Sequence, residues 1–274
     1  MNSQFKLISK ITLILSLTLS FFSCEKIIDL PLNESEQKVV IEASVSNILE
    51  DSYILLSKTA KLYGKDIFEK VNNGTVTITD NNDVKTVFTE DGTGVGRYTN
   101  PTFVVSPNNS YLLQVTVDGK TYSAESTTQS FTGLNFLFSI KQMNPGFNPN
   151  DADKDSVNIV VMGYSDKVNE TNYYRFNLYT NGEFDNQLNL NDDKITNGQD
   201  IDSPLFKTFE SKDTVLLEFV NMDKANYTYF LSLANTLDDG PFSATPANPI
   251  TNLDNGALGY FGAYIKDTIS LIIP

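Results

Sequence analysis

Apolar and polar residues alternate along much of the chain, with the period of two that is typical of half-buried β-strands. The segment 74–80 (G-T-V-T-I-T-D) shows this most clearly, because Val76 and Ile78 point to one face and the threonines to the other. Turn sequences at 80–83 and at Asp118-Gly119 each predict a hairpin. Further strands of this first region are expected at 39–45, 53–56, 84–89, 111–117 and 120–124.

A polar stretch at 126–130 separates these segments from a second β-type region. Within it, Ala225–Leu237 fits two patterns: apolar side chains recur every four residues, as in an amphipathic helix, and they also alternate, as in a strand. The sequence leaves helix and strand open for this segment. Strands of the second region are expected at 134–140, 157–162, 173–179, 215–220, 259–264 and 268–273.

The spacing of these segments predicts an all-β, mainly antiparallel fold with two β-sandwich domains. We place the first domain at 38–128 and a second, β-rich domain at 129–274, with at most one or two short helices in the second. The V-T-I-T-D hairpin and the P-N-N-S-Y-L-L-Q-V-T-V strand make the first domain resemble a prealbumin/Ig-like or carboxypeptidase-regulatory sandwich. That resemblance implies a fold and no particular function.

The amino terminus has the three parts of a secretory signal peptide. Lys6 and Lys10 form a basic start, residues 11–22 are uncharged and largely apolar, and Ser23 precedes the only cysteine, Cys24. The apolar run is too short for a membrane-spanning helix, which needs about 20 residues. The sequence F-F-S-C resembles a bacterial lipoprotein signal, in which the cysteine becomes the acylated first residue.

Cleavage at that position gives a signal peptide at 1–23 and a tether at 24–37. A lipid on Cys24 would anchor the chain to a membrane, because two or more acyl chains bind stably where a single chain is marginal. The alternative is a plain signal peptide that is cleaved elsewhere and leaves a free thiol.

Composition limits the chemistry that the chain can perform. None of its 274 residues is histidine, which excludes Ser-His-Asp and Cys-His catalysis and zinc sites built on histidine. A single cysteine excludes internal disulfides and iron–sulfur centres. The formal net charge of −14 argues against nucleic acid as a partner, since phosphate binding needs clustered lysine and arginine. No cofactor is expected.

Three aspartates, Asp151, Asp153 and Asp155, form a D-x-D-x-D run like the start of a calcium-binding EF-hand loop. Ser156 stands where that loop needs glycine, and Met162 stands where it needs glutamate, so an EF-hand is excluded. A looser calcium site and a solvated acidic loop are the two interpretations left open.

The carboxy-terminal half carries a distinctive sequence at 241–264, P-F-S-A-T-P-A-N-P-I-T-N-L-D-N-G-A-L-G-Y-F-G-A-Y. It is similar to the closing motif of a Bacteroidota outer-membrane lipoprotein family, domain of unknown function 4249. V-V-I-E-A-S-V-S at 39–46, N-Y-Y-R-F-N-L-Y at 172–179 and N-D-D-K-I-T-N-G-Q at 191–199 also fit that family. The resemblance implies lipid attachment at Cys24, frequent pairing with TonB-dependent transporters and no established activity.

Three short sequences add modification sites to this expectation. Ser156, Thr214 and Thr268 each follow aspartate and precede an apolar residue, which fits the pattern that Bacteroidota use for O-glycosylation. The pattern agrees with an extracytoplasmic location.

These observations favour a non-catalytic, lipid-anchored binding or accessory component that works with a TonB-dependent transporter in nutrient uptake at the outer membrane. A structural or adhesive envelope protein without a transport role is the alternative. A histidine-independent hydrolase that uses carboxylates is the second alternative. The sequence leaves open the ligand, the identity of the partner, the oligomeric state, and whether the periplasmic or the surface-exposed face of the membrane is occupied.

Overall fold

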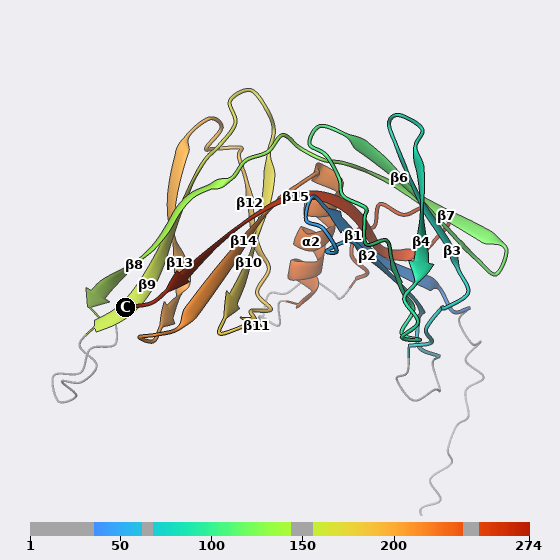
Figure 1. The fold of residues 1–274 in the computed structure, drawn as a ribbon, viewed down its shortest axis with the longest axis horizontal. Coiled ribbons are helices and arrows are strands. Elements are labelled where there is room, and N and C mark those ends of the chain that lie inside the picture. The colour runs from blue at the N-terminus through green and yellow to red at the C-terminus, as the bar shows by residue number, and fades with distance from the viewer. Residues whose placement is uncertain (1–35, 62–67, 144–155, 238–246) are drawn as a thin grey trace, which may run out of the picture. The chain divides into compact units, whose positions relative to one another are not determined.

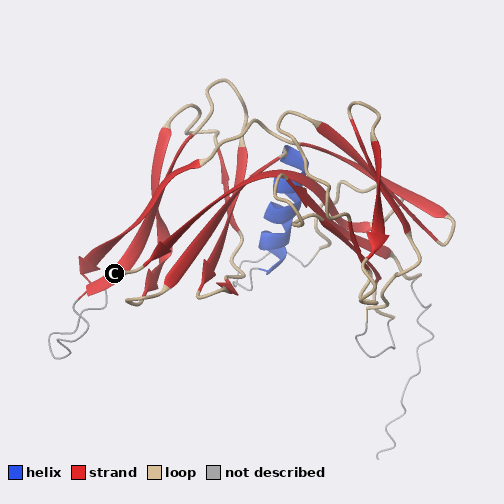
Figure 2. Cartoon of the chain, viewed as in Figure 1, coloured by secondary structure: helices blue, strands red, loops and turns tan. Residues whose placement is uncertain are grey.

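The computed structural model describes residues 36–61, 68–143, 156–237 and 247–274. In this part the chain forms strands and a single helix (Figures 1 and 2). In chain order the elements are β1 (Val39–Ser46), β2 (Tyr53–Lys58), β3 (Thr75–Asp80), β4 (Lys85–Glu90), β5 (Arg97–Thr99), β6 (Ser110–Val117), β7 (Lys120–Thr127), β8 (Leu134–Met143), β9 (Ser156–Ser165), β10 (Tyr173–Thr180), β11 (Glu183–Phe184), β12 (Asn189–Asp192), β13 (Asp200–Phe209), β14 (Thr214–Met222), α2 (Lys224–Leu237) and β15 (Leu258–Ile272).

The strands form two sheets. The larger sheet has 12 strands in the order β11-β10-β14-β15-β1-β2-β5-β4-β3-β6-β7, with β12 paired to β10 off this path. The smaller sheet has three strands in the order β13-β9-β8. Every pairing between these strands is antiparallel except that of β1 with β15, which is parallel. The described chain is therefore all-β and mainly antiparallel, as its alternating residues predict, and its two sheets are consistent with a β-sandwich.

The last strand differs from the sequence prediction, which was wrong to expect two strands at 259–264 and 268–273. The structure has one strand of 15 residues, β15, whose first half pairs with β1 and whose second half pairs with β14. Lys266 keeps the middle of β15 extended: its backbone N–H donates to the side chain of Asn47 at 2.7 Å, and its ammonium group pairs with the carboxylates of Asp51 and Glu218. A polar residue in mid-strand thus marks an internal ion pair and not a break.

The buried side chains gather in three clusters. The first cluster lies among β1–β7 and takes in Phe261 and Ala263 from β15. The second joins β9, β10 and β14, and Leu271 of β15 packs against it. The third lies beneath α2. The division into domains at residue 128 stays a prediction, because β15 contributes to the cores on both sides of it.

Helix α2 decides between the two interpretations of residues 225–237. Asp223 caps its amino end by accepting a hydrogen bond from the backbone N–H of Asn226 at 2.8 Å. The side chain of Asn226 is fully buried and donates to the carbonyl oxygen of Phe261 in β15 at 3.0 Å. Tyr229 packs on the sheet in the third cluster. A strand at this place would lose both the cap and the anchored asparagine.

Two glycines of β15 allow close packing in the distinctive closing sequence. Gly259 has a φ of 96°, and a Cβ atom there would lie 2.0 Å from the carbonyl oxygen of Ile41 in β1. A Cβ atom on Gly262 would lie 1.9 Å from the hydroxyl of Tyr264, whose ring covers this glycine. Neither position has room for a side chain.

Candidate functional site

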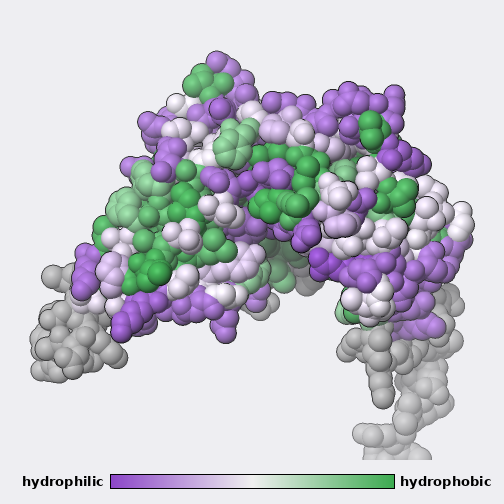
Figure 3. All heavy atoms as spheres, in the orientation of Figure 1, coloured by the Kyte–Doolittle hydropathy of each residue, from purple (hydrophilic) through white to green (hydrophobic). Residues whose placement is uncertain are grey.

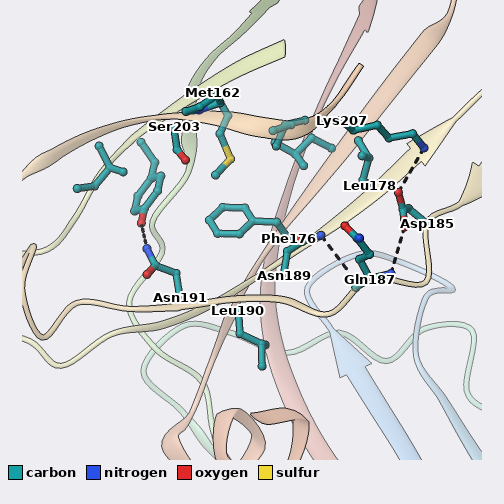
Figure 4. A pocket seen from close by; sticks show the side chains of 15 residues that line it. Met162, Phe176, Leu178, Asp185, Gln187, Asn189, Leu190, Asn191, Ser203 and Lys207 are labelled. Atoms are coloured by element: carbon teal, nitrogen blue, oxygen red, sulfur yellow. Dashed lines mark hydrogen bonds and ion pairs between the residues drawn. The ribbon is translucent and has the colours of Figure 1, made fainter. Parts of the chain in front are cut away.

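A cavity of about 260 Å³ lies between the two sheets in the second half of the chain (Figure 4). Its walls come from β9 and β13 of the smaller sheet and from β10, β12 and β14 of the larger one. The lining residues are Met162, Tyr164, Phe176, Leu178, Asp185, Gln187, Asn189, Leu190, Asn191, Ile201, Ser203, Pro204, Leu205, Lys207 and Leu217.

The inner wall of the cavity is apolar because inward positions alternate along each strand. Met162 of β9, Phe176 and Leu178 of β10 and Leu217 of β14 are buried, and Ile201 of β13 packs against the same cluster. The described residues of this inner wall carry no charged group, so it suits the apolar body of a small ligand.

The opening of the cavity lies where the edges of the two sheets meet. β13 is an edge strand of the smaller sheet, and β12 is a short strand that pairs only with β10. The pairing of β13 with β9 shifts register between Pro204 and Thr208. Bulges and prolines are typical of edge strands, where they prevent pairing with a further strand. Here they leave the sandwich uncovered along the edge formed by β13.

Two polar bridges join the two walls of the cavity. The ammonium group of Lys207 lies 3.3 Å from the carboxylate of Asp185, and the side chain of Asn191 donates to the hydroxyl of Tyr164 at 2.8 Å (Figure 4). Gln187 lies in the sequence between Asp185 and Asn191, one residue of each bridge, and its backbone N–H donates to the carboxylate of Asp185 at 3.1 Å. The bridges hold the two sheet edges at a fixed separation.

Tyr164 is a buried titratable residue of the cavity wall. Burial, together with the negative charges of Asp166 and Asp193, raises the pKa of Tyr164 to about 12, although the hydrogen bond from Asn191 lowers it. The hydroxyl is therefore neutral at physiological pH. It serves as an acceptor for Asn191 and as part of the cavity wall.

The arrangement differs from what a carboxylate hydrolase needs. Such an enzyme places two carboxylates together and raises the pKa of at least one. In the described residues the cavity is lined by one carboxylate, Asp185, and it is already paired with Lys207. Among the carboxyl groups of the described residues whose pKa is shifted, the pKa is lowered in each case, at Asp51, Asp80, Asp91, Asp192 and Asp213.

The site residues predicted from the sequence lie elsewhere. Cys24 and the three aspartates at 151, 153 and 155 fall outside the described residues, so lipid attachment and calcium binding stay predictions. Ser156, Thr214 and Thr268 are exposed, at the beginning of β9, the beginning of β14 and within β15. None of these three lines the cavity. No group of acidic residues that could hold a metal ion occurs in the ranges that the structure describes.

Sequence reasoning did not find the cavity, and it missed β12 and β13. Pro204 interrupts the alternation of β13, so Ile201 and Leu205 give a weak strand signal. In the sequence, the stretch 191–199 shows only a family pattern, yet Asn191 at its start bridges the two walls of the cavity. A run of polar amides beside apolar positions at 187–191 was the signal available in the sequence.

A second surface feature lies on the outer face of the smaller sheet. Phe138 and Ile140 of β8 are 43% and 42% exposed, and they stand opposite Val161 and Ile159 of β9. These four residues form the outer apolar face. Figure 3 shows apolar residues gathered on the left of the viewed surface, in the region of β8. Contiguous exposed apolar patches mark interaction sites.

Comparisons with other proteins bear on the whole chain and not on the cavity alone. Among the described residues, no helix is both long and apolar enough to span a membrane. A search of curated proteins gave no match. A family match covers residues 25–270, from just after Cys24 to near the end of β15, and includes the cavity and the closing sequence. The chain therefore belongs to the family described as "Domain of unknown function (DUF4249)".

Proposed function

We propose that this protein is a non-catalytic, lipid-anchored binding component of the bacterial outer membrane that takes up a small ligand between its two sheets. The observation that carries the proposal is the cavity, which has an apolar wall, a polar opening and no pair of carboxylates in its described lining. Sites for small molecules are typically concave, mostly apolar and furnished with a few polar groups at fixed positions.

A fluorescent probe tests ligand binding directly. N-phenyl-1-naphthylamine is uncharged and apolar, and its emission rises when it leaves water. We expect saturable binding to the purified protein and its loss in Ser203→Trp, because the indole fills the cavity from β13. Asp202→Trp is the matched control, since Asp202 is exposed on the same strand and is not part of the lining. Binding that survives Ser203→Trp, with excitation outside the indole band, refutes the site.

The lipid anchor rests on the signal sequence and on Cys24 as the only cysteine. Replacement of Cys24 by serine removes the acyl acceptor, so we expect the protein to move from the membrane fraction to the soluble fraction of cells. Retention of the variant in membranes refutes the lipid assignment. Protease digestion of intact cells would then separate a surface-exposed from a periplasmic location.

For the partner we propose a TonB-dependent receptor, as the family resemblance implies. The outer apolar face supports a protein partner, because Phe138 and Ile140 are exposed side by side with apolar neighbours. Purification from solubilised membranes should recover such a receptor with the wild type and much less of it with Phe138→Ser. Recovery of no receptor with the wild type would favour the structural or adhesive alternative, in which the same anchored fold has no transport role.

A further inference from the structure

The opening of the cavity contains one positive and one negative side chain that neutralise each other. Among the described lining residues, Lys207 and Asp185 are the charged ones, and they form the 3.3 Å ion pair across the opening. Each has a further partner: the Lys207 ammonium group lies 3.4 Å from the hydroxyl of Thr180, and Asp185 accepts the backbone N–H of Gln187. A ligand that enters therefore meets no free charge.

Neutral polar groups stand beside this pair. Gln187 and Asn189 present side-chain amides, and Ser203 presents a hydroxyl on the opposite edge. In the described part of the chain, the side chains of Gln187 and Ser203 make no hydrogen bond, and Asn189 makes one long bond of 3.5 Å to a backbone carbonyl. Amides and hydroxyls both donate and accept, so they match the hydroxyl or amide group of an uncharged ligand.

A charged ligand is disfavoured on two grounds. A carboxylate must lose its water and then compete with Asp185 for Lys207, and an ammonium group must compete with Lys207 for Asp185. A buried charge without a free counter-charge is costly, whereas a neutral polar group needs only a hydrogen-bond partner. The formal net charge of −14 on the chain further repels anions at a distance.

We infer that the cavity selects uncharged amphiphiles, with an apolar body against Met162, Phe176 and Leu217 and a hydroxyl or amide head at Gln187 and Ser203. The Lys207–Asp185 pair determines specificity, because each charge is already paired with the other and neither is free to pair with a ligand. The inference rests on the proposed binding function and adds the chemical class of the ligand.

Three ligands with one apolar body test the inference: 1-naphthylacetamide, 1-naphthylacetate and 1-naphthylmethylamine, titrated by calorimetry into the purified full-length protein. For the wild type we expect the amide to bind about tenfold more tightly than either ion. Asp185→Asn frees Lys207 and should shift preference by about tenfold toward the acetate. Lys207→Gln frees Asp185 and should shift preference toward the amine by a similar factor.

Both variants are expected to fold, because the side chains of Lys207 and Asp185 are 40% and 20% exposed, and circular dichroism checks this. Lys194→Gln breaks an exposed ion pair that does not line the cavity, and its ligand preference should equal that of the wild type. Equal affinities for the three ligands, or the same preference in both charge variants, overturn the inference. If Ser203→Trp still abolishes binding in that case, the proposed function stands and only the ligand class is wrong. Binding that persists in Ser203→Trp overturns both.

Discussion

Replacement of Lys266 by methionine removes the cation from a buried cluster of charges on β15. The ammonium group lies 3.0 Å from Asp51 and 3.2 Å from Glu218, and the Lys266 side chain is only 9% exposed. Methionine keeps the unbranched length of the side chain but leaves two carboxylates without their counter-charge. Asp51 retains a hydrogen bond from the hydroxyl of Ser46 at 2.6 Å.

The size of the effect follows from burial. Removal of one partner from a buried ion pair typically costs about 3–5 kcal/mol of unfolding free energy. Asp51 is 32% exposed and Glu218 is 11% exposed, so water still solvates the first carboxylate but hardly the second. Glu218 also accepts a hydrogen bond from the side chain of Asn177 at 2.5 Å, which reduces the cost of leaving this carboxylate without its cation. We therefore expect a cost near the lower limit, about 3 kcal/mol.

The cost should depend on pH in a defined direction. Burial raises the pKa of Asp51, but the charge of Lys266 and the hydrogen bond from Ser46 outweigh it, so the pKa is lowered from 3.8. In the wild type this carboxylate stabilises the fold above its ordinary pKa, and the contribution is lost as the pH falls through the lowered value. In the variant the lowering by Lys266 is lost while burial remains, so the pKa of Asp51 rises relative to the wild type. The deficit is therefore largest near neutral pH and shrinks as the pH falls toward about 4.

Urea unfolding followed by circular dichroism measures both effects, at about pH 7 and about pH 4.5. The double variant Lys266→Met with Glu218→Gln should recover part of the loss, because it removes the more deeply buried unpaired charge. Lys194→Met is the surface control: the Lys194 side chain is 71% exposed, and its loss should leave the unfolding free energy nearly unchanged. A cost at Lys266 as small as that control, or one that does not change with pH, would refute the electrostatic reasoning.

Three further changes test other parts of the structure. Gly262→Ala should destabilise the fold by about 3 kcal/mol in thermal melts, because the new Cβ displaces Tyr264 and its hydrogen bond to Asn226; an unchanged melting temperature contradicts this packing. Asn226→Ala should cost about 2 kcal/mol in urea unfolding, since it leaves the hydroxyl of Tyr264 and the carbonyl oxygen of Phe261 without their buried partner; an unchanged unfolding free energy would contradict the buried role. In absorbance titrations, Tyr164→Phe should remove a phenol that ionises only near pH 12; loss of one that ionises near pH 10 would contradict its burial.

Local sequence is sufficient to locate most of the strands. At 74–80 the alternation of Val76 and Ile78 with threonines matches β3, which begins at Thr75, and the turn after Asp80 leads into β4 as a hairpin. Such pairs need only neighbours in the chain, so residue type and period settle them. The closing sequence at 241–264 likewise resembles the closing motif of the family, and the family match confirms that prediction.

Other features depend on partners that are distant in the sequence. Asn47 and Lys266 are separated by 219 residues, yet their contact helps to keep β15 a single strand where the sequence predicts two. Residues 225–237 carry both a helical and a strand period, and the helix is favoured because Asp223 caps it and Asn226 is anchored on β15.

The sequence by itself determined the fold class, most strand positions, the family and the absence of histidine chemistry. Only the tertiary structure decided where the cavity lies. The cavity combines side chains from β9, β10, β12, β13 and β14, and its opening depends on how the edges of two sheets meet. The Lys207–Asp185 and Asn191–Tyr164 bridges join residues from different sheets. No local pattern encodes such a space, because its shape depends on long-range packing of strands whose own sequences specify only which face is apolar.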